Sequence, residues 1–175
     1  GPVADDRLYL TGNGVPSMRV GGVTYPLALP APAAAPSVVL SGTPDSEVAT
    51  FIVYAYTTVT EFDEESAPSP VSDAFLWSAG LTVTVSGFSA APAGRGVNRR
   101  RIYRSQTSGL GITDLYFVAE IPVAQSSYVH DLATAPLQEV LPSADYDPPP
   151  DTMAGLISMP NGMMAAFDGK EILFS

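Results

Sequence analysis

The chain has 175 residues, with 18 acidic against 8 basic side chains and a formal net charge of −10. This negative charge argues against nucleic-acid binding, because a phosphate backbone is bound by net positive surface. Hydrophobic residues make up 46% of the chain and charged residues 15%, which excludes a generically disordered protein. The 17 prolines and 15 glycines exclude long helices and predict short strands joined by turns, an all-β protein.

The chain contains no cysteine. A disulfide scaffold, a thiolate metal site and a cysteine nucleophile are therefore excluded. No apolar run approaches the roughly 20 residues of a membrane-spanning helix, and the first residues lack the pattern of a signal peptide, so membrane insertion is not expected. The chain starts Gly1-Pro2 and stops directly after a strand-like segment at 171–174, so we expect a piece of a longer protein.

Residues 1–36 predict a β-hairpin followed by a linker. A strand is expected at 7–10, and Gly21-Gly22 between short apolar runs at 17–20 and 23–27 is a typical two-residue hairpin turn. Residues 30–37 contain three prolines and no large apolar side chain, which indicates a stiff connector and the first domain boundary.

Residues 37–142 predict a two-sheet β-sandwich, because short strands alternate with turns about every ten residues. The strongest strand signal is 49–60 (ATFIVYAYTTVT), whose two faces both begin apolar, so we expect a central strand. One predicted face holds Phe51, Val53, Ala55 and Val59, and the other holds Ile52, Tyr54 and Tyr56.

The later strands of this region follow a period of two. Residues 81–86 alternate strictly, which directs Leu81, Val83 and Val85 inward. Further strands are expected around Ile102-Tyr103 and at 126–131. A last inward row is predicted from Leu115, Phe117, Ala119 and Ile121.

Residues 143–175 predict a proline-rich linker and the start of a further β-rich region. Pro148-Pro149-Pro150 favours an extended polyproline conformation. Turns at 160–162 and 168–169 then predict a three-stranded meander. Three strands bury too little to stand alone, so we expect them to pack on the hairpin, on the sandwich or on residues outside this chain.

Two charged clusters are the candidate interaction residues. The acidic cluster at 61–65 holds carboxylates on a flexible turn, as calcium sites do, but its spacing matches no metal-loop signature, and a solvated turn is the favoured interpretation. Five of the eight basic residues lie between 95 and 104, and we expect them to pair with the acidic turn of a neighbouring strand or subunit. The candidates are Glu61, Asp63, Glu64, Glu65, Arg95, Arg99, Arg100, Arg101 and Arg104.

No enzyme constellation is found. His130 is the single histidine, and Asp131 beside it on a strand would point to the opposite face, so it could not orient the ring. The glycine pairs at 94–96 and 109–111 lack the helix and the lysine of a phosphate loop. We therefore expect no catalytic residue, no metal and no cofactor.

Residues 51–72 (FIVYAYTTVTEFDEESAPSPVS) resemble the last hairpin of a fibronectin type III domain. Segments 81–86 and 101–105 are similar to that family's earlier strands, and 115–121 and 127–129 to its middle ones. The resemblance implies a fibronectin-III/immunoglobulin-like β-sandwich with a permuted strand order.

The longer arrangement resembles structural proteins of tailed bacteriophages and prophages. It comprises DRLY at 6–9, GVTYPL at 22–27, EESAPSP at 64–70, RIYR at 101–104, FVAEIP at 117–122, LPS at 141–143, PPP at 148–150 and MPNGM at 159–163. The resemblance implies a virion component of the tail or tail-attachment region, with the sandwich decorating a larger, propeller-like β-rich body. Its partners would be other virion proteins, further copies of itself in a homo-oligomer, or the host surface.

The expected work is therefore assembly or host-surface contact by a non-enzymatic protein. The expected contact surface comprises the loops 87–98 and 105–114, the arginine strand and the acidic turn. One alternative is a bacterial cell-surface or secreted adhesion module. Another is a carbohydrate-binding module, for which Trp77, Tyr103, Tyr116 and Tyr146 are the candidate aromatics.

Overall fold

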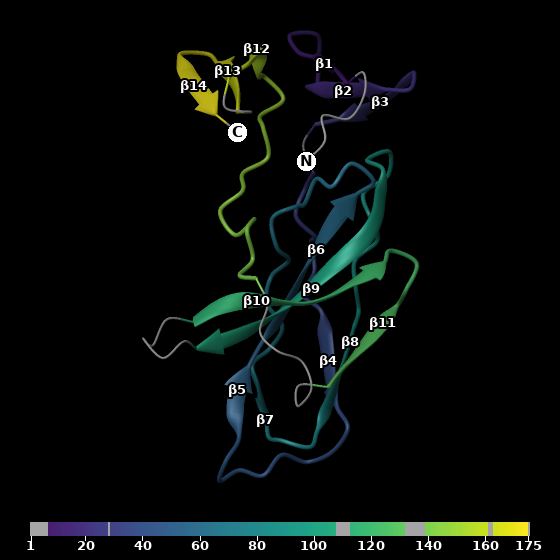
Figure 1. Cartoon of the computed structure of the whole chain (residues 1–175), viewed down its shortest axis with the longest axis vertical. Helices are drawn as coiled ribbons and strands as arrows, with labels where there is room; N and C mark the ends of the chain where they lie inside the picture. The colour runs from purple at the N-terminus through teal and green to yellow at the C-terminus, as the bar shows by residue number, and fades with distance from the viewer. Residues whose placement is uncertain (1–6, 28, 108–112, 132–138, 161–162, 175) are drawn as a thin grey trace. The chain divides into compact units, whose positions relative to one another are not determined.

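A computed structural model describes residues 7–27, 29–107, 113–131, 139–160 and 163–174. Within these ranges the chain forms fourteen β-strands in small antiparallel sheets and no helix (Figure 1). The all-β, sandwich-like fold expected from the proline and glycine content is confirmed. A helix long and apolar enough to cross a membrane is not found in these ranges.

The chain divides into two compact units. The first unit combines Gly1–Pro30 with Asp147–Ser175, and the second is Ala31–Tyr146. In the sequence, the second unit is therefore inserted between the two segments that form the first unit.

The described strands of the first unit form two three-stranded sheets. β1 (Leu8–Leu10), β2 (Ser17–Val20) and β3 (Val23–Pro26) form one in that order, and β12 (Ala154–Ser158), β13 (Met164–Asp168) and β14 (Glu171–Phe174) form the other. Gly21 and Gly22 have φ of 57° and 86°, which fits a hairpin turn with two left-handed residues. The hairpin and the meander are thus confirmed, while the Asn161-Gly162 turn lies outside the described residues.

The second unit contains eight described strands in three groups. The groups are β11 (Ser127–Asp131), β8 (Thr82–Ser86) and β4 (Ser37–Leu40); β10 (Thr113–Pro122), β9 (Val97–Thr107) and β6 (Tyr54–Thr60); and the pair β5 (Thr50–Ile52) and β7 (Phe75–Trp77). β7 has no counterpart among the predicted strands. The pairing register places β9 between β6 and β10.

The core of the second unit lies between these sheets. Val83 and Val85 are fully buried, as the alternation at 81–86 predicts. They form one cluster with Ile52, Tyr54, Ile102 and Ile121.

The predicted strand at 49–60 divides at Val53, because its two halves join different partners: β5 pairs with β7, and β6 pairs with β9. β6 is also not central in its sheet, which corrects the expectation. All its residues are nevertheless buried. The reason is a segment of irregular backbone, residues 65–72, that covers the far edge of β6.

Three serines attach this segment to β6. Ser66, Ser69 and Ser72 each donate their N–H to a carbonyl of β6, at 3.0, 2.8 and 2.8 Å, and each Oγ accepts the N–H of the same β6 residue, at 3.0, 3.1 and 3.0 Å. Every third residue of the segment thus matches every second residue of the strand. Prolines, which cannot donate a backbone hydrogen bond, stand between the serines, so the sheet ends here.

The predicted inward row on β10 is confirmed for Ile121 but wrong for Phe117. The register with β9 shifts between Phe117 and Ala119, because Val118 is an extra, bulged residue. Ile121 lies in the core, whereas Phe117 stands beside Tyr103 on the opposite face of the sheet. One inserted residue reverses the side-chain alternation on the two sides of the bulge.

The predicted loop at 105–114 is shorter than expected. β9 continues to Thr107 and β10 begins at Thr113. Paired antiparallel neighbours extend both strands beyond the apolar residues that signalled them. Residues 108–112 lie outside the described residues.

Candidate functional site

β9 distributes its arginines between the two faces of the β10-β9-β6 sheet. Arg100 lies on the same face as the core residue Ile102. Arg99 and Arg101 lie on the other face, together with Tyr103. We call this second face the outer face. Arg99, Arg100 and Arg101 are consecutive residues of β9, and side chains alternate along a strand. The prediction that Arg99 and Arg101 point opposite to Arg100 is therefore confirmed.

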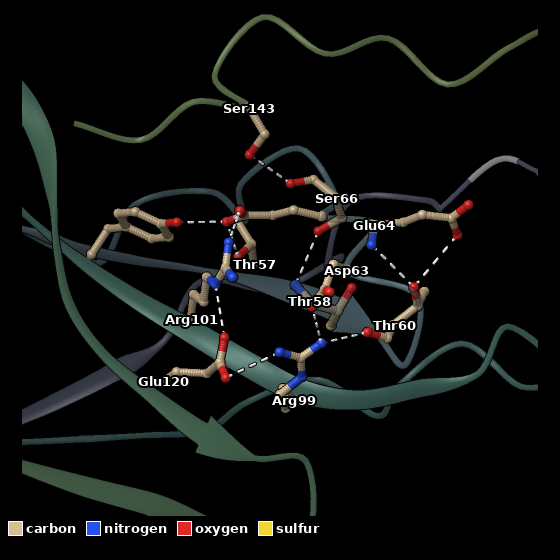
Figure 2. Close-up of polar contacts among 12 residues, drawn as sticks. Thr57, Thr58, Thr60, Asp63, Glu64, Ser66, Arg99, Arg101, Glu120 and Ser143 are labelled. Carbon is tan, nitrogen blue, oxygen red and sulfur yellow. Dashed lines mark hydrogen bonds and ion pairs between the residues drawn. The ribbon is translucent and has the colours of Figure 1, made fainter. Parts of the chain in front are cut away.

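A network of paired charges occupies the outer face (Figure 2). Arg101 binds Glu65 at 2.6 Å and Glu120 at 2.9 Å. Arg99 binds the same Glu120 at 3.2 Å and Asp63 at 2.7 Å. The predicted pairing of the arginine strand with the acidic turn therefore occurs within the chain, with Glu120 of β10 as a shared partner that the sequence analysis missed.

Glu65 is the most buried acid of this network. Its carboxylate accepts hydrogen bonds from the hydroxyls of Tyr103 at 2.6 Å and Thr57 at 2.7 Å, besides the ion pair with Arg101. Its side chain is only 6% exposed, against 76% for Asp63. Glu65 is therefore held by three neighbours in a poorly hydrated position, while Asp63 stays in water.

The network favours the charged forms of Glu120 and Arg101. Partial burial alone would raise the pKa of Glu120, but the hydrogen bonds and charges of Arg101 and Arg99 outweigh it and lower the pKa. Burial would likewise lower the pKa of Arg101, but Glu120 and Glu65 raise it. The pKa of Tyr103 is raised by burial and by the neighbouring Glu65 carboxylate. At neutral pH the phenol therefore stays protonated and donates to Glu65.

Arg100 and Arg104 do not contribute to the outer face. Arg100 is 5% exposed, donates to the carbonyls of Val123 and Ser89, and lies 5.3 Å from the ring centre of Phe88. Arg104 is partly buried and its Nη2 donates to Gln106 at 3.3 Å. Burial lowers the pKa of both guanidinium groups.

The acidic turn is built around Thr60. The Oγ1 of Thr60 accepts the backbone N–H groups of Phe62 and Glu64, both at 3.2 Å, and Asp63 takes a left-handed φ of 64°. Glu61 and Glu64 belong to this turn, and the N–H of Glu61 donates to the carbonyl of Gly96 at 2.8 Å. The turn therefore connects to the loop that carries Arg95 and leads into β9.

A short segment, residues 139–143, crosses toward the serine edge; we call it the strap. The N–H of Phe117 donates to the carbonyl of Glu139, and that of Leu141 to the carbonyl of Leu115, both at 2.8 Å. At the other end Ser143 is fully buried, and its Oγ donates to the carbonyl of Ser66 at 2.8 Å. Figure 2 shows Ser143 and Ser66 facing one another beside the charge network.

The strap and the network line an open pocket of about 340 Å³. It is lined by Arg101, Tyr103, Phe117, Glu120, Glu139, Val140 and Pro142. The bulge at Val118 matters here, because it places the Phe117 ring on this face. The sequence does not identify Phe117 or Glu139 as pocket residues. A bulge without glycine and a strap formed by distant residues leave no local sequence pattern.

The remaining candidates have structural surroundings. His130 is 2% exposed, its Nδ1 hydrogen-bonds to the hydroxyl of Tyr54 at 2.8 Å, and burial together with the Arg104 charge lowers its pKa to about 4. Trp77 packs against the core and donates its indole N–H to the carbonyl of Leu81 at 2.8 Å. Of the four candidate aromatics, Tyr103 is 2% exposed and Tyr146 is 55% exposed. These side chains therefore do not form the exposed row that a flat glycan platform requires.

In the ranges that the structure describes, no three acidic or histidine side chains are grouped so that they could hold a metal ion. No protein-family model matches the chain, and no curated protein matches it significantly.

Proposed function

We propose that the chain is a non-enzymatic structural and interaction component of a phage virion, acting in tail assembly or host-surface contact. The sequence resemblance to tailed-phage structural proteins supports this role. The observation that carries it is the organisation of the chain: the sandwich 31–146 is inserted between two segments that form one unit. Such an arrangement suits a module displayed from a larger β-rich body.

The first unit supplies surface for assembly. Phe167 of β13 and Ile172 of β14 are cross-strand neighbours and are 51% and 58% exposed, and Ile157 and Phe174 are 58% and 61% exposed. Clustered exposed apolar side chains of this kind are typical of protein–protein contact. These side chains support the proposal that the chain binds other virion proteins or further copies of itself.

Mass spectrometry of purified particles tests the proposal. Phage particles released by the strain that encodes the chain are purified by density gradient, and the fractions are compared with the cell-envelope fraction of the same culture. We expect peptides of this chain to co-sediment with particles. Peptides confined to the envelope or to the medium would contradict the proposal and favour the adhesion module.

The adhesion or carbohydrate-binding alternative is favoured by one observation, the pocket beneath the strap. A cell-surface or secreted location would then replace the virion, and the same fractionation separates the two.

A further inference from the structure

We propose that the pocket beneath the strap binds a neutral sugar residue. The inference rests on the proposed function only for the source of that sugar, a glycan of the host surface. The binding itself follows from the groups that line the pocket. Its volume of about 340 Å³ is within the usual range of small-ligand pockets, roughly 300–1,000 Å³.

The charges of the pocket favour a neutral ligand. Glu120 is bound by both Arg99 and Arg101, and Arg101 is bound also by Glu65. A cationic ligand would meet the guanidinium of Arg101, and an anionic ligand would meet the carboxylates of Glu120 and Glu139. A neutral ligand faces neither repulsion, because Arg101 and Glu120 already pair with one another. The attraction of the exposed Glu139 carboxylate for a cation is screened by water.

The hydrogen-bonding groups favour hydroxyls. The Nε of Arg101 donates to Glu120 and its Nη1 to Glu65, and Nη2 provides two further donors. Glu139 is exposed, and its carboxylate makes no ion pair within the described ranges. A hydroxyl both donates and accepts, so adjacent hydroxyls of one sugar can bind a guanidinium donor and a carboxylate acceptor together.

The apolar part of the lining suits the C–H face of a sugar ring. Phe117 is half-buried, with its ring 5.9 Å from that of Tyr103 in an edge-to-face contact. Val140, 44% exposed, and Pro142 belong to the strap and line the same pocket. Apolar walls with a few fixed polar groups are the usual composition of a ligand site. Because Glu65 and Glu120 hold Arg101 in place, the polar groups need little rearrangement on binding.

NMR on the full chain tests the proposal. Saturation transfer is measured for D-glucose, D-galactose, N-acetyl-D-glucosamine and L-rhamnose, and amide shifts are mapped with ¹⁵N-labelled protein. We expect at least one sugar to bind, with its largest shifts at Phe117, Glu120, Glu139 and Val140. Glu139→Ala should weaken binding about tenfold, the loss expected for a hydrogen bond to a charged group.

Two variants keep the test interpretable. Glu47→Ala removes an exposed acid of the same unit outside the pocket and should leave the affinity unchanged. Phe117→Leu keeps an apolar side chain but removes the ring, and should also weaken binding. Unchanged ¹⁵N spectra away from the substituted residue verify that each variant is folded.

Four results would overturn the proposal. They are no binding of any of the four sugars, amide shifts centred away from the pocket, an affinity unaffected by Glu139→Ala, or tighter binding of Nα-acetyl-lysine methyl ester or acetate at the same amides. If no sugar binds but the chain is found in purified particles, the sugar site is refuted and the proposed function stands. If a sugar binds but the chain is found only in the cell envelope, the sugar site stands and the proposed virion function is refuted.

Discussion

Ser69 and the backbone of Tyr56 exchange two hydrogen bonds, in which the N–H of Ser69 donates to the Tyr56 carbonyl at 2.8 Å and the N–H of Tyr56 donates to the Ser69 Oγ at 3.1 Å. The serine side chain thus takes the place of a backbone carbonyl in a β-ladder. Its hydroxyl then donates to the carbonyl of Pro70 at 2.9 Å. A proline-rich segment, poor in N–H donors, can therefore close the edge of a sheet without leaving buried groups unpaired.

Ser69→Ala should destabilise the protein by about 1–3 kcal/mol, because the buried N–H of Tyr56 would lose its acceptor. Chemical unfolding in urea measures the change. Ser46→Ala, at an exposed position of the same unit, is the control and should stay within about 0.5 kcal/mol of the parent. Equal effects of the two substitutions would contradict the role assigned to the Ser69 hydroxyl.

The two acids of the turn should differ in their contribution to stability. Glu65→Gln should cost about 3 kcal/mol, because it removes the buried negative charge that pairs with the partly exposed Arg101. Asp63→Asn should cost under about 1 kcal/mol, because Asp63 is 76% exposed and its ion pair is screened by water. The urea midpoints of the two variants provide the comparison. A larger loss of stability for Asp63→Asn than for Glu65→Gln would contradict the importance assigned to the buried Glu65.

The buried His130 should make stability depend on pH. Its pKa of about 4 in the folded protein is below the usual 6.5 of an unfolded histidine, so the unfolded state binds the extra proton first. Stability should therefore be complete above about pH 6.5 and fall by up to about 3 kcal/mol as the pH decreases toward 4.

The matched variant for this effect is His130→Gln, which retains a hydrogen-bonding side chain but does not titrate. Unfolding free energies are measured for both proteins between pH 7 and about 4, and the difference between the two curves isolates the histidine from the carboxylates. A difference that does not vary with pH would show that His130 keeps an ordinary pKa in the fold.

Gly87 and Gly94 have nearly the same positive φ, 72° and 70°, but different surroundings. A Cβ at Gly87 would lie 2.7 Å from the Oγ of Ser37 and 3.2 Å from its backbone nitrogen, whereas a Cβ at Gly94 meets nothing within 4 Å. Gly94→Ala should cost about 1–2 kcal/mol from backbone strain alone. Gly87→Ala should cost more, and thermal unfolding of the two variants separates strain from crowding; equal losses would exclude the contact with Ser37.

Local sequence patterns predicted much of the fold. The turn glycines at 21–22 were sufficient to predict the hairpin, and the alternation at 81–86 was sufficient to predict that Val83 and Val85 are buried. Turn geometry and the two-residue period of a strand are properties of neighbouring residues. The same alternation separated Arg99 and Arg101 from Arg100. The pairing of these arginines with the acidic turn followed from opposite charge.

Other features depend on contacts between distant residues. The division of the 49–60 strand at Val53 is set by its two different partner strands, and the bulge at Val118 by the register against β9. The pocket exists only because the bulge turns Phe117 outward and the strap brings Glu139 beside it.

The sequence alone determined the all-β class, most of the strands and the polar character of the arginine strand, because composition and short-range periodicity specify them. The tertiary structure decided which strands pair, which edge the serines close and which side chains share the pocket. These depend on register and on hydrogen bonds between segments up to 77 residues apart, as between Ser66 and Ser143, and a shift of one residue in register exchanges the two faces of a strand.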